Sequence, residues 1–188
     1  SETTTSAPTS RTIGAATTGT VTVNNAVKIS GSQSDVTAAL VTASSKVVAG
    51  ASDTIANVTD AVTAAQGQAI AAASNITGIF SGGVEDTVSN LYDTNNTAIT
   101  AAFSAISADD TDVLVNIKDT AYDANNNDTT INASGLSAIG NATSGTVTVS
   151  NAIKISGSQS EVTAALVTES SKVVAATALV TISDAAYH

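Results

Sequence analysis

The sequence from Gly19 to Ala49 is repeated almost unchanged from Gly145 to Ala175, 126 residues later in the chain. The first copy reads GTVTVNNAVKISGSQSDVTAALVTASSKVVA, and the second reads GTVTVSNAIKISGSQSEVTAALVTESSKVVA. Four positions differ between them: Asn24/Ser150, Val27/Ile153, Asp35/Glu161 and Ala43/Glu169. Near-identity on this scale indicates tandem duplication, so we expect both copies to adopt one conformation within a repetitive architecture.

The core that this chain can build is limited to small side chains. Of its 188 residues 43% are hydrophobic, but these are mostly Ala and Val, with two Phe and no Trp. A thin core between closely approaching backbones suits stacked repeats better than a globule built around large side chains. We therefore expect a single repetitive domain over 19–188, preceded by a Ser/Thr-rich extension over 1–18.

Short strand-like runs alternate with helix-like runs. The β-branched runs predict strands at 20–23, 27–29, 77–80, 113–117, 146–149, 153–155 and 179–182. Apolar residues at helical spacing predict helices along 36–47, 55–69, 84–92 and 99–106. This alternation predicts an α/β solenoid of short parallel strands and short helices. The Thr and Val content of the helical runs lowers their helix propensity, which leaves an all-β solenoid as the alternative.

Acidic residues recur where apolar runs end. A carboxylate in the first helical turn is favourable, as is a serine that caps the helix from the position just before it. We therefore expect helices to start at these positions, capped by Ser34 and Ser160 in the two copies. The acidic residues concerned are Asp35, Asp53, Glu85, Asp86, Asp119, Glu161 and Asp184.

Three runs carry a resemblance to a known class of proteins. They are GASDTIANV from Gly50, GTVTVSNAIKISGSQSEVTAALV from Gly145, and VTISDAAY from Val180. Their texture resembles the Ala/Thr/Val-rich repeats of giant cell-surface proteins of cyanobacteria and other marine bacteria, which include adhesin-like, haemagglutinin-like and motility-associated molecules. The resemblance covers most of the chain after about Arg11, and it implies an extracellular, repetitive, structural or adhesive role.

Composition argues against several functional classes. A net charge of −10 disfavours nucleic acid and anionic membranes as partners, because both need a basic face. The chain has no cysteine and a single histidine, His188, so the usual Ser–His and Cys–His arrangements and thiolate or histidine zinc sites are not expected. No apolar run is long enough to predict a membrane span. We expect a protein without enzymatic activity.

The acidic middle of the chain is the one positive chemical signal. Nine carboxylates and one lysine lie between Glu85 and Asp128. Calcium prefers several oxygen ligands from a loop, and Asp or Asn at alternate positions can supply them. The candidate ligands are Asp123, Asn125, Asn127 and Asp128, and then Asp109, Asp110 and Asp112. The alternative is that these Asp and Asn residues only build turns through their side-chain hydrogen bonds.

The sequence thus supports two hypotheses about function. The first is a structural or adhesive segment of an extracellular bacterial surface protein, whose partners are copies of itself or neighbouring repeats of a longer chain. Its end faces would permit stacking into fibres. The second is a calcium-dependent module that binds a surface glycan or a protein through its acidic central loops.

Overall fold

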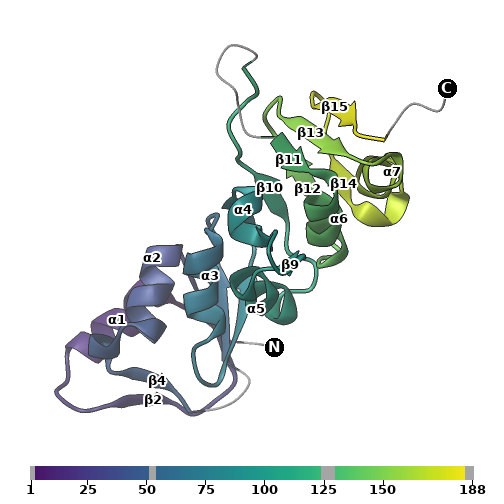
Figure 1. Cartoon of the computed structure of the whole chain (residues 1–188). Coiled ribbons are helices and arrows are strands. Elements are labelled where there is room, and N and C mark those ends of the chain that lie inside the picture. Colours follow the sequence, from purple (N-terminus) through teal and green to yellow (C-terminus); the bar gives the residue numbers. More distant parts are fainter. Residues whose placement is uncertain (1–2, 51–53, 124–129, 185–188) are drawn as a thin grey trace.

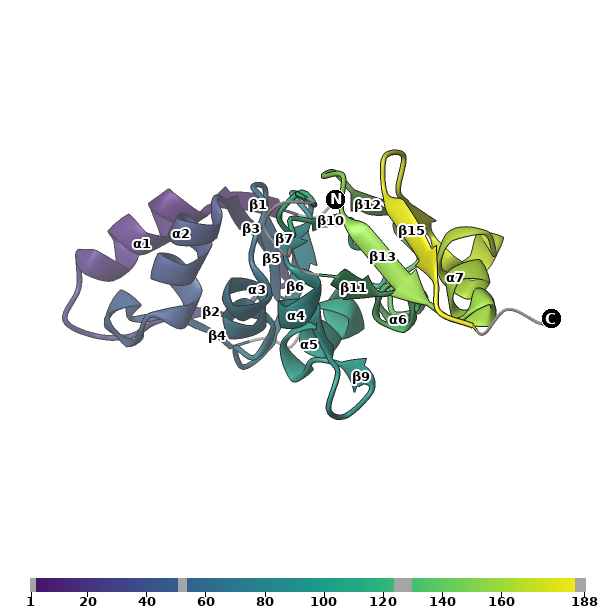
Figure 2. The same cartoon turned by 45° about the horizontal axis from the view of Figure 1, so that its top comes forward.

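The chain forms an elongated α/β molecule with the two duplicated segments at opposite ends (Figures 1 and 2). The computed structural model describes residues 3–50, 54–123 and 130–184. The first half of the described chain contains β1 Thr3–Ser6, α1 Ala7–Ala15, β2 Val21–Val23, β3 Val27–Gly31, α2 Gln33–Val36, the π-helical turn η1 Thr37–Val41, the 3-10 turn η2 Ala43–Ser45, β4 Val47–Ala49, β5 Thr54–Val58, α3 Ala64–Ala71 and β6 Ile76–Phe80. The second half contains β7 Val84–Asp86, α4 Val88–Leu91, β8 Tyr92–Asp93, β9 Ala98–Ile99, α5 Ala101–Asp109, β10 Val115–Ile117, β11 Thr130–Asn132, α6 Ala133–Asn141, β12 Val147–Val149, β13 Lys154–Gly157, α7 Gln159–Leu166, the 3-10 turn η3 Glu169–Ser171, β14 Val173–Val174 and β15 Leu179–Ile182.

Parallel pairing dominates the sheets. The first sheet has the order β1-β3-β5-β6, the second β14-β12-β10-β7 and the third β11-β13-β15, and β2 pairs with β4. All of these pairs are parallel, whereas the short pair β8-β9 is antiparallel. Since the described residues also form seven α-helices, the prediction of an α/β protein with parallel strands is confirmed, and the all-β alternative is wrong.

Serine and threonine caps set where the helices begin. The hydroxyl of Ser32 accepts the backbone N–H of Asp35 at 3.2 Å, and that of Ser158 accepts the N–H of Glu161 at 3.3 Å. The predicted caps Ser34 and Ser160 are therefore wrong by two residues, because each lies inside its helix. The prediction of a carboxylate in the first turn is confirmed for α2 and α7.

The segment 1–18, expected to be an extension outside the domain, contributes β1 and α1 to the fold. β1 pairs with β3, with Thr3 opposite Val27. The side chain of Ser6 caps α1, and Pro8 lies in its first turn, where a missing N–H leaves no helical bond unmade. The segment is thus built into the first sheet.

All four predicted helices include strand residues. The predicted helix over 84–92 contains β7 and the start of β8 on either side of α4, and the predicted helix over 99–106 begins in β9. The predicted helix over 55–69 starts only at Ala64, since Ile55 and Val58 lie in β5, which pairs with β3 on one side and β6 on the other. The predicted helix over 36–47 ends at Val41, and Val47 begins β4.

The two copies share the turns that follow their helices, although the helix of the first copy becomes π-helical at Thr37 and α7 in the second copy stays α-helical to Leu166. Lys46 and Lys172 both have a φ of 57°, the left-handed conformation that ends each 3-10 turn. In both copies a threonine N–H reaches back five residues at 2.9 Å, from Thr42 to the Thr37 carbonyl and from Thr168 to the Thr163 carbonyl. The expectation that both copies adopt one conformation is confirmed for these turns.

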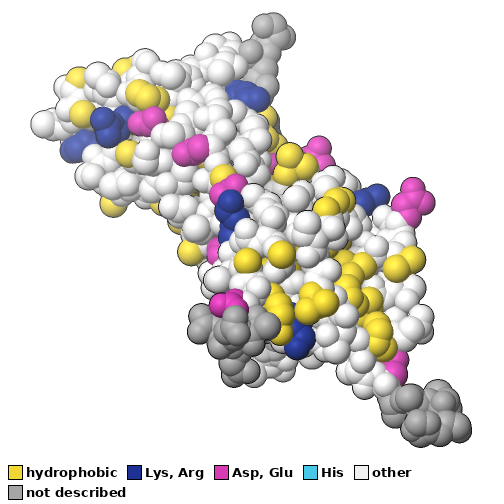
Figure 3. Space-filling view, turned by 90° about the horizontal axis from the view of Figure 1, so that it is seen from above, with side chains coloured by type: hydrophobic (Ala, Val, Ile, Leu, Met, Phe, Trp, Pro, Cys, Tyr) yellow, Lys and Arg dark blue, Asp and Glu magenta, His cyan; other side chains and the backbone are white. Residues whose placement is uncertain are grey.

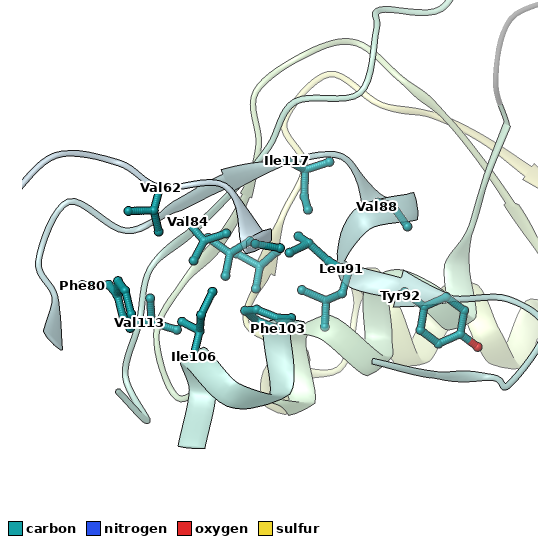
Figure 4. Packing of buried hydrophobic residues seen from close by; sticks show 14 of the residues in the cluster. Val62, Phe80, Val84, Val88, Leu91, Tyr92, Phe103, Ile106, Val113 and Ile117 are labelled. Carbon is teal, nitrogen blue, oxygen red and sulfur yellow. The ribbon is translucent and has the colours of Figure 1, made fainter. Parts of the chain in front are cut away.

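A core of small side chains runs along the molecule, with its largest members in the middle. Phe80 and Phe103 are 2% and 0% exposed. They lie among aliphatic side chains such as Leu91, Ile106 and Val113 (Figure 4). Close helix contacts accompany this packing, because a Cβ on Gly14 would lie 2.0 Å from the carbonyl oxygen of Ser45.

Candidate functional site

A polar row crosses the outer face of the second sheet. Asn116 on β10 lies opposite Glu85 on β7 and Thr148 on β12. Their strand neighbours Val115 and Ile117 are buried, so the alternation of a strand turns the three polar side chains outward. The sheet thereby holds a carboxylate, an amide and a hydroxyl in one line on one face.

Hydrogen bonds fix the orientation of this row. The amide of Asn116 donates from Nδ2 to Glu85 Oε1 at 3.0 Å, and its Oδ1 accepts from the hydroxyl of Ser150. Lys118 Nζ lies 3.4 Å from Glu85 Oε2, and both side chains are about half exposed. The pair contributes little to stability at that exposure, but it holds the carboxylate in place.

A hollow of about 450 Å³ lies over the row. Gly82 and Gly83 border it at the start of β7, and a Cβ on Gly83, whose φ is +77°, would lie 2.8 Å from the Leu114 carbonyl oxygen. The exposed side chain of Leu114 adds an apolar patch. The full lining is Gly82, Gly83, Val84, Glu85, Leu114, Val115, Asn116, Thr146, Thr148 and Ser150. Acceptors, donors and an apolar patch together suit a ligand with several hydroxyl groups.

The structure gives the predicted calcium ligands Asp109 and Asp110 another role. Asp109 Oδ2 accepts the N–H of Gly78 at 2.7 Å, and Asp110 Oδ2 accepts that of Phe80 at 2.7 Å. These amides belong to β6, the last strand of the first sheet, so the two carboxylates occupy the position of a further strand. Burial raises the pKa of Asp110, the bond from Phe80 lowers it, and the neighbouring Asp112 raises it.

The other predicted calcium ligands form no site in the described chain. Asp123 is described and has an interaction partner, whereas Asn125, Asn127 and Asp128 lie outside the described residues. Within 3–50, 54–123 and 130–184, no three His, Cys, Asp or Glu side chains are grouped so that they could hold a metal ion.

Four aspartates tie helices to the strands that follow them. Each lies at the end of a strand and accepts the N–H of the first residue of an earlier helix. The pairs are Asp60 Oδ1 with Gln33 N at 2.5 Å, Asp86 Oδ2 with Ala64 N at 2.9 Å, Asp119 Oδ2 with Val88 N at 2.7 Å, and Asp184 Oδ2 with Gln159 N at 2.6 Å. A carboxylate at this position satisfies an amide that has no partner in the helix and interacts favourably with the helix dipole.

These bonds correct the expected role of the acidic residues after the apolar runs. Residues 120–123 are not helical, and Asp119 instead caps α4, which precedes it in the chain. Burial raises the pKa of Asp119, the bond from Val88 lowers it, and the carboxylate of Asp86 raises it. Asp53 lies outside the described residues. The motif Val/Ile-x-Asp, which occurs four times and ends at these four aspartates, is the signal that could have identified them.

Comparison of the chain with protein-family models, with curated proteins and with solved structures finds no match. In the part of the chain that the structure describes, none of the helices has the length and apolar character needed to cross a membrane.

Proposed function

We propose that the chain is a structural segment of an extracellular bacterial surface protein, built as an α/β solenoid whose layers repeat along the long axis. The spacing of the paired strands is the observation that carries the proposal. In every parallel pair of strands, the residues opposite each other are 22 to 32 positions apart in the sequence. This separation is the length of one repeat in known solenoid architectures.

The recurring aspartates support the same proposal. Each joins the helix of one layer to the strand of the next, with 22 to 31 residues between donor and acceptor. Asp60 and Asp184 make the same bond in the two copies, to Gln33 and Gln159. A protein whose layers depend on their neighbours in this way is suited to serve as a spacer or support, since its length follows from the number of layers.

The identical ends of the two copies permit a direct experiment. Since Lys46–Ala49 and Lys172–Ala175 both read KVVA, a chain of residues 1–175 followed by 50–188 adds one full period with native sequence at the junction. We expect the added 126 residues to lengthen the molecule in small-angle X-ray scattering while the radius of its cross-section stays the same. The circular dichroism per residue should also be unchanged. A matched control is residues 1–175 followed by 70–188, which joins the segments out of phase.

Two results would contradict the solenoid. One is scattering from the in-phase chain that describes separate bodies on a flexible linker. The other is an in-phase chain that unfolds as readily as the out-of-phase control.

A second candidate function rests on the hollow over the second sheet, where Glu85, Asn116 and Thr148 meet. A glycan would find alternating acceptors and donors there, which would make the segment adhesive as well as structural. The test is calorimetric titration with a panel of oligosaccharides, with and without calcium. Thr148→Ala should weaken binding, whereas Thr22→Ala, at the equivalent position in the first copy, should not. Equal effects of the two substitutions, or no saturable binding, would exclude this candidate.

A further inference from the structure

The same apolar residues are buried in the second copy and partly exposed in the first. Ile139 is fully buried, whereas its counterpart Ile13 is 51% exposed. Val147 is likewise buried and Val21 only partly so. The further pairs Val149/Val23 and Ile153/Val27 show the same difference. The sequence around Val21 is the same as that around Val147, so the difference in burial of these two residues lies in what covers them.

The second copy is covered by the chain that precedes it. β10 pairs with β12, with Val115 opposite Val147, and the ring of Tyr92 lies 3.0 Å from where a Cβ of Gly135 would be. In the first copy β2 is the counterpart of β12, and among the described strands only β4 pairs with it. The surface of β1, α1 and β2, which we call the N-terminal face, is therefore equivalent to an internal contact surface, and no described strand covers it.

A hollow marks this face. It has a volume of about 160 Å³ and lies between β1, α1 and the strands β2, β3 and β4. Thr5 and Ser10 line it, and the residues 126 positions later are Ile131 and Leu136, which are 4% and 0% exposed. The remaining lining is Ile13, Val21, Val23, Val27, Ile29 and Val47.

The opposite end of the molecule shows the converse difference. Val180 and Ile182 on β15 are 39% and 47% exposed, whereas their counterparts Ala56 and Val58 on β5 are fully buried. β5 is covered because β6 pairs with its outer edge, but in the described chain no strand pairs with the outer edge of β15. Figure 3 shows exposed apolar side chains gathered on the half of the molecule that ends at the C-terminus. We call the surface of β14 and β15 the C-terminal face.

The edges of the two sheets differ in protection. The outward amides of β6 donate to Asp109 and Asp110, which closes that edge. Leu179 donates to Ile153, just before β13, and Ser183 donates to Gly157, at 2.9 Å each, so the alternation of a parallel strand turns the amides of Val180 and Ile182 outward. An edge strand with apolar side chains and no such cover is a template for pairing with another strand.

We propose that the C-terminal face of one molecule docks on the N-terminal face of a second copy, head to tail, with β15 pairing in parallel with β1 of the next molecule. The proposal rests on the solenoid of the proposed function, because it continues the internal stacking across a molecular boundary. Ile131, Ile155 and Val180 lie in one register, and so do Thr5 and Ile29. Continuing the register places Val180 opposite Thr5 of the second copy.

Symmetry agrees with this arrangement. A head-to-tail contact uses two different surfaces and leaves both ends open, so it produces chains of molecules rather than closed dimers.

The sequence contains no cysteine, so only introduced cysteines can form disulfides in a cross-linking experiment. Thr5→Cys together with Val180→Cys should give a ladder of disulfide-linked oligomers under mild oxidation, because directly paired strand residues have Cα atoms within disulfide range. The matched control is Thr5→Cys with Leu114→Cys, since Leu114 is 55% exposed but lies between the two ends. A ladder from the first variant and not from the control supports the proposal.

Sedimentation of the cysteine-free protein gives the second measurement. We expect the apparent mass to rise with protein concentration. Val180→Lys should raise the Kd of this association at least about tenfold, because the substitution places a charge in an apolar contact. Leu114→Lys should leave association unchanged. Circular dichroism of each variant shows that it is folded.

Three outcomes would overturn the proposal: a monomer at every concentration with no ladder, equal ladders from both cysteine pairs, or cross-linking by Thr5→Cys alone, which would indicate contact between like ends. None of them affects the solenoid itself. If the chain with the added period lengthens as expected while the native chain stays monomeric, the docking is wrong and the proposed function stands.

Discussion

Replacing Ser10 with leucine should stabilise the protein, because the equivalent helix position 126 residues later is Leu136. Leu136 is fully buried in α6, whereas Ser10 borders the hollow of about 160 Å³ in the first copy. The backbone around the two positions is alike, because α1 and α6 each precede one copy of the repeated passage and end near a glycine that contacts its 3-10 turn. The substitution therefore places in α1 the side chain that is already packed at the equivalent position of α6.

The magnitude follows from the volume of the hollow. Filling an enclosed cavity of 160 Å³ at about 24 cal/mol per Å³ would contribute about 4 kcal/mol, and this is an upper bound here because the hollow is open to solvent beside the half-exposed Ile13. A leucine side chain fills about half of that volume, which reduces the gain to about 2 kcal/mol. The substitution also removes the hydrogen bond from the Ser10 hydroxyl to the Ser6 carbonyl at 3.3 Å, a loss of about 1 kcal/mol. The net expectation is a gain of up to about 1 kcal/mol, or up to about 4 °C in Tm.

The assay is thermal and urea unfolding of a matched set of variants. Thr12→Leu places the same side chain on an exposed position of α1 and should change the free energy of unfolding by less than about 0.5 kcal/mol. The reverse substitution, Leu136→Ser, should cost about 3–5 kcal/mol because it opens a cavity in a filled core. The reasoning is refuted if Ser10→Leu is no more stable than the native chain, or if Leu136→Ser costs less than about 1 kcal/mol.

Two further predictions concern the bonds between layers. Burial raises the pKa of Asp119 above its ordinary 3.8, so the folded state binds the proton more tightly, and ionisation lowers stability as the pH rises through the raised pKa. The amide oxygen of Asn in Asp119→Asn can still accept from Val88, so this substitution should raise the free energy of unfolding at pH 7 and change it least below pH 3.8. Urea unfolding at both pH values checks this. A lower stability of the variant at pH 7 would contradict the prediction. Gly14→Ala should lower stability by about 1–3 kcal/mol, because its Cβ would lie 2.0 Å from the Ser45 carbonyl oxygen. Gly19→Ala, with 3.7 Å to the nearest atom, is the control in thermal unfolding, and equal losses would argue against the close contact.

Much of the strand framework could be predicted because its signal is local. Runs such as Val147–Val149 and Leu179–Ile182 combine β-branched residues with alternation, and they lie where the sequence places them. β4 was not predicted, since the helical spacing continues from Val36 through Val47 without a glycine to end it. The chain reverses there at Lys46, which adopts the left-handed conformation that glycine usually supplies.

The functional residues were harder to predict because their partners are distant in sequence. Asp109 and Asp110 suggest a cation site when they are considered alone, yet each binds a backbone amide about 30 residues earlier. The polar row of Glu85, Asn116 and Thr148 likewise depends on strand register, which single-sequence patterns do not fix. Neither arrangement can be recognised until the layers are stacked.

Because of the aspartate bonds, a folding unit does not end where the repeated sequence ends. A fragment that stops at Ala175 contains the whole second copy but lacks Asp184, and the first amide of α7 then loses its acceptor. The corresponding cut in the first copy must fall after Asp60. Anyone who dissects this protein into expressible pieces should therefore cut beyond the aspartate, since each layer is completed by a residue that the next layer supplies.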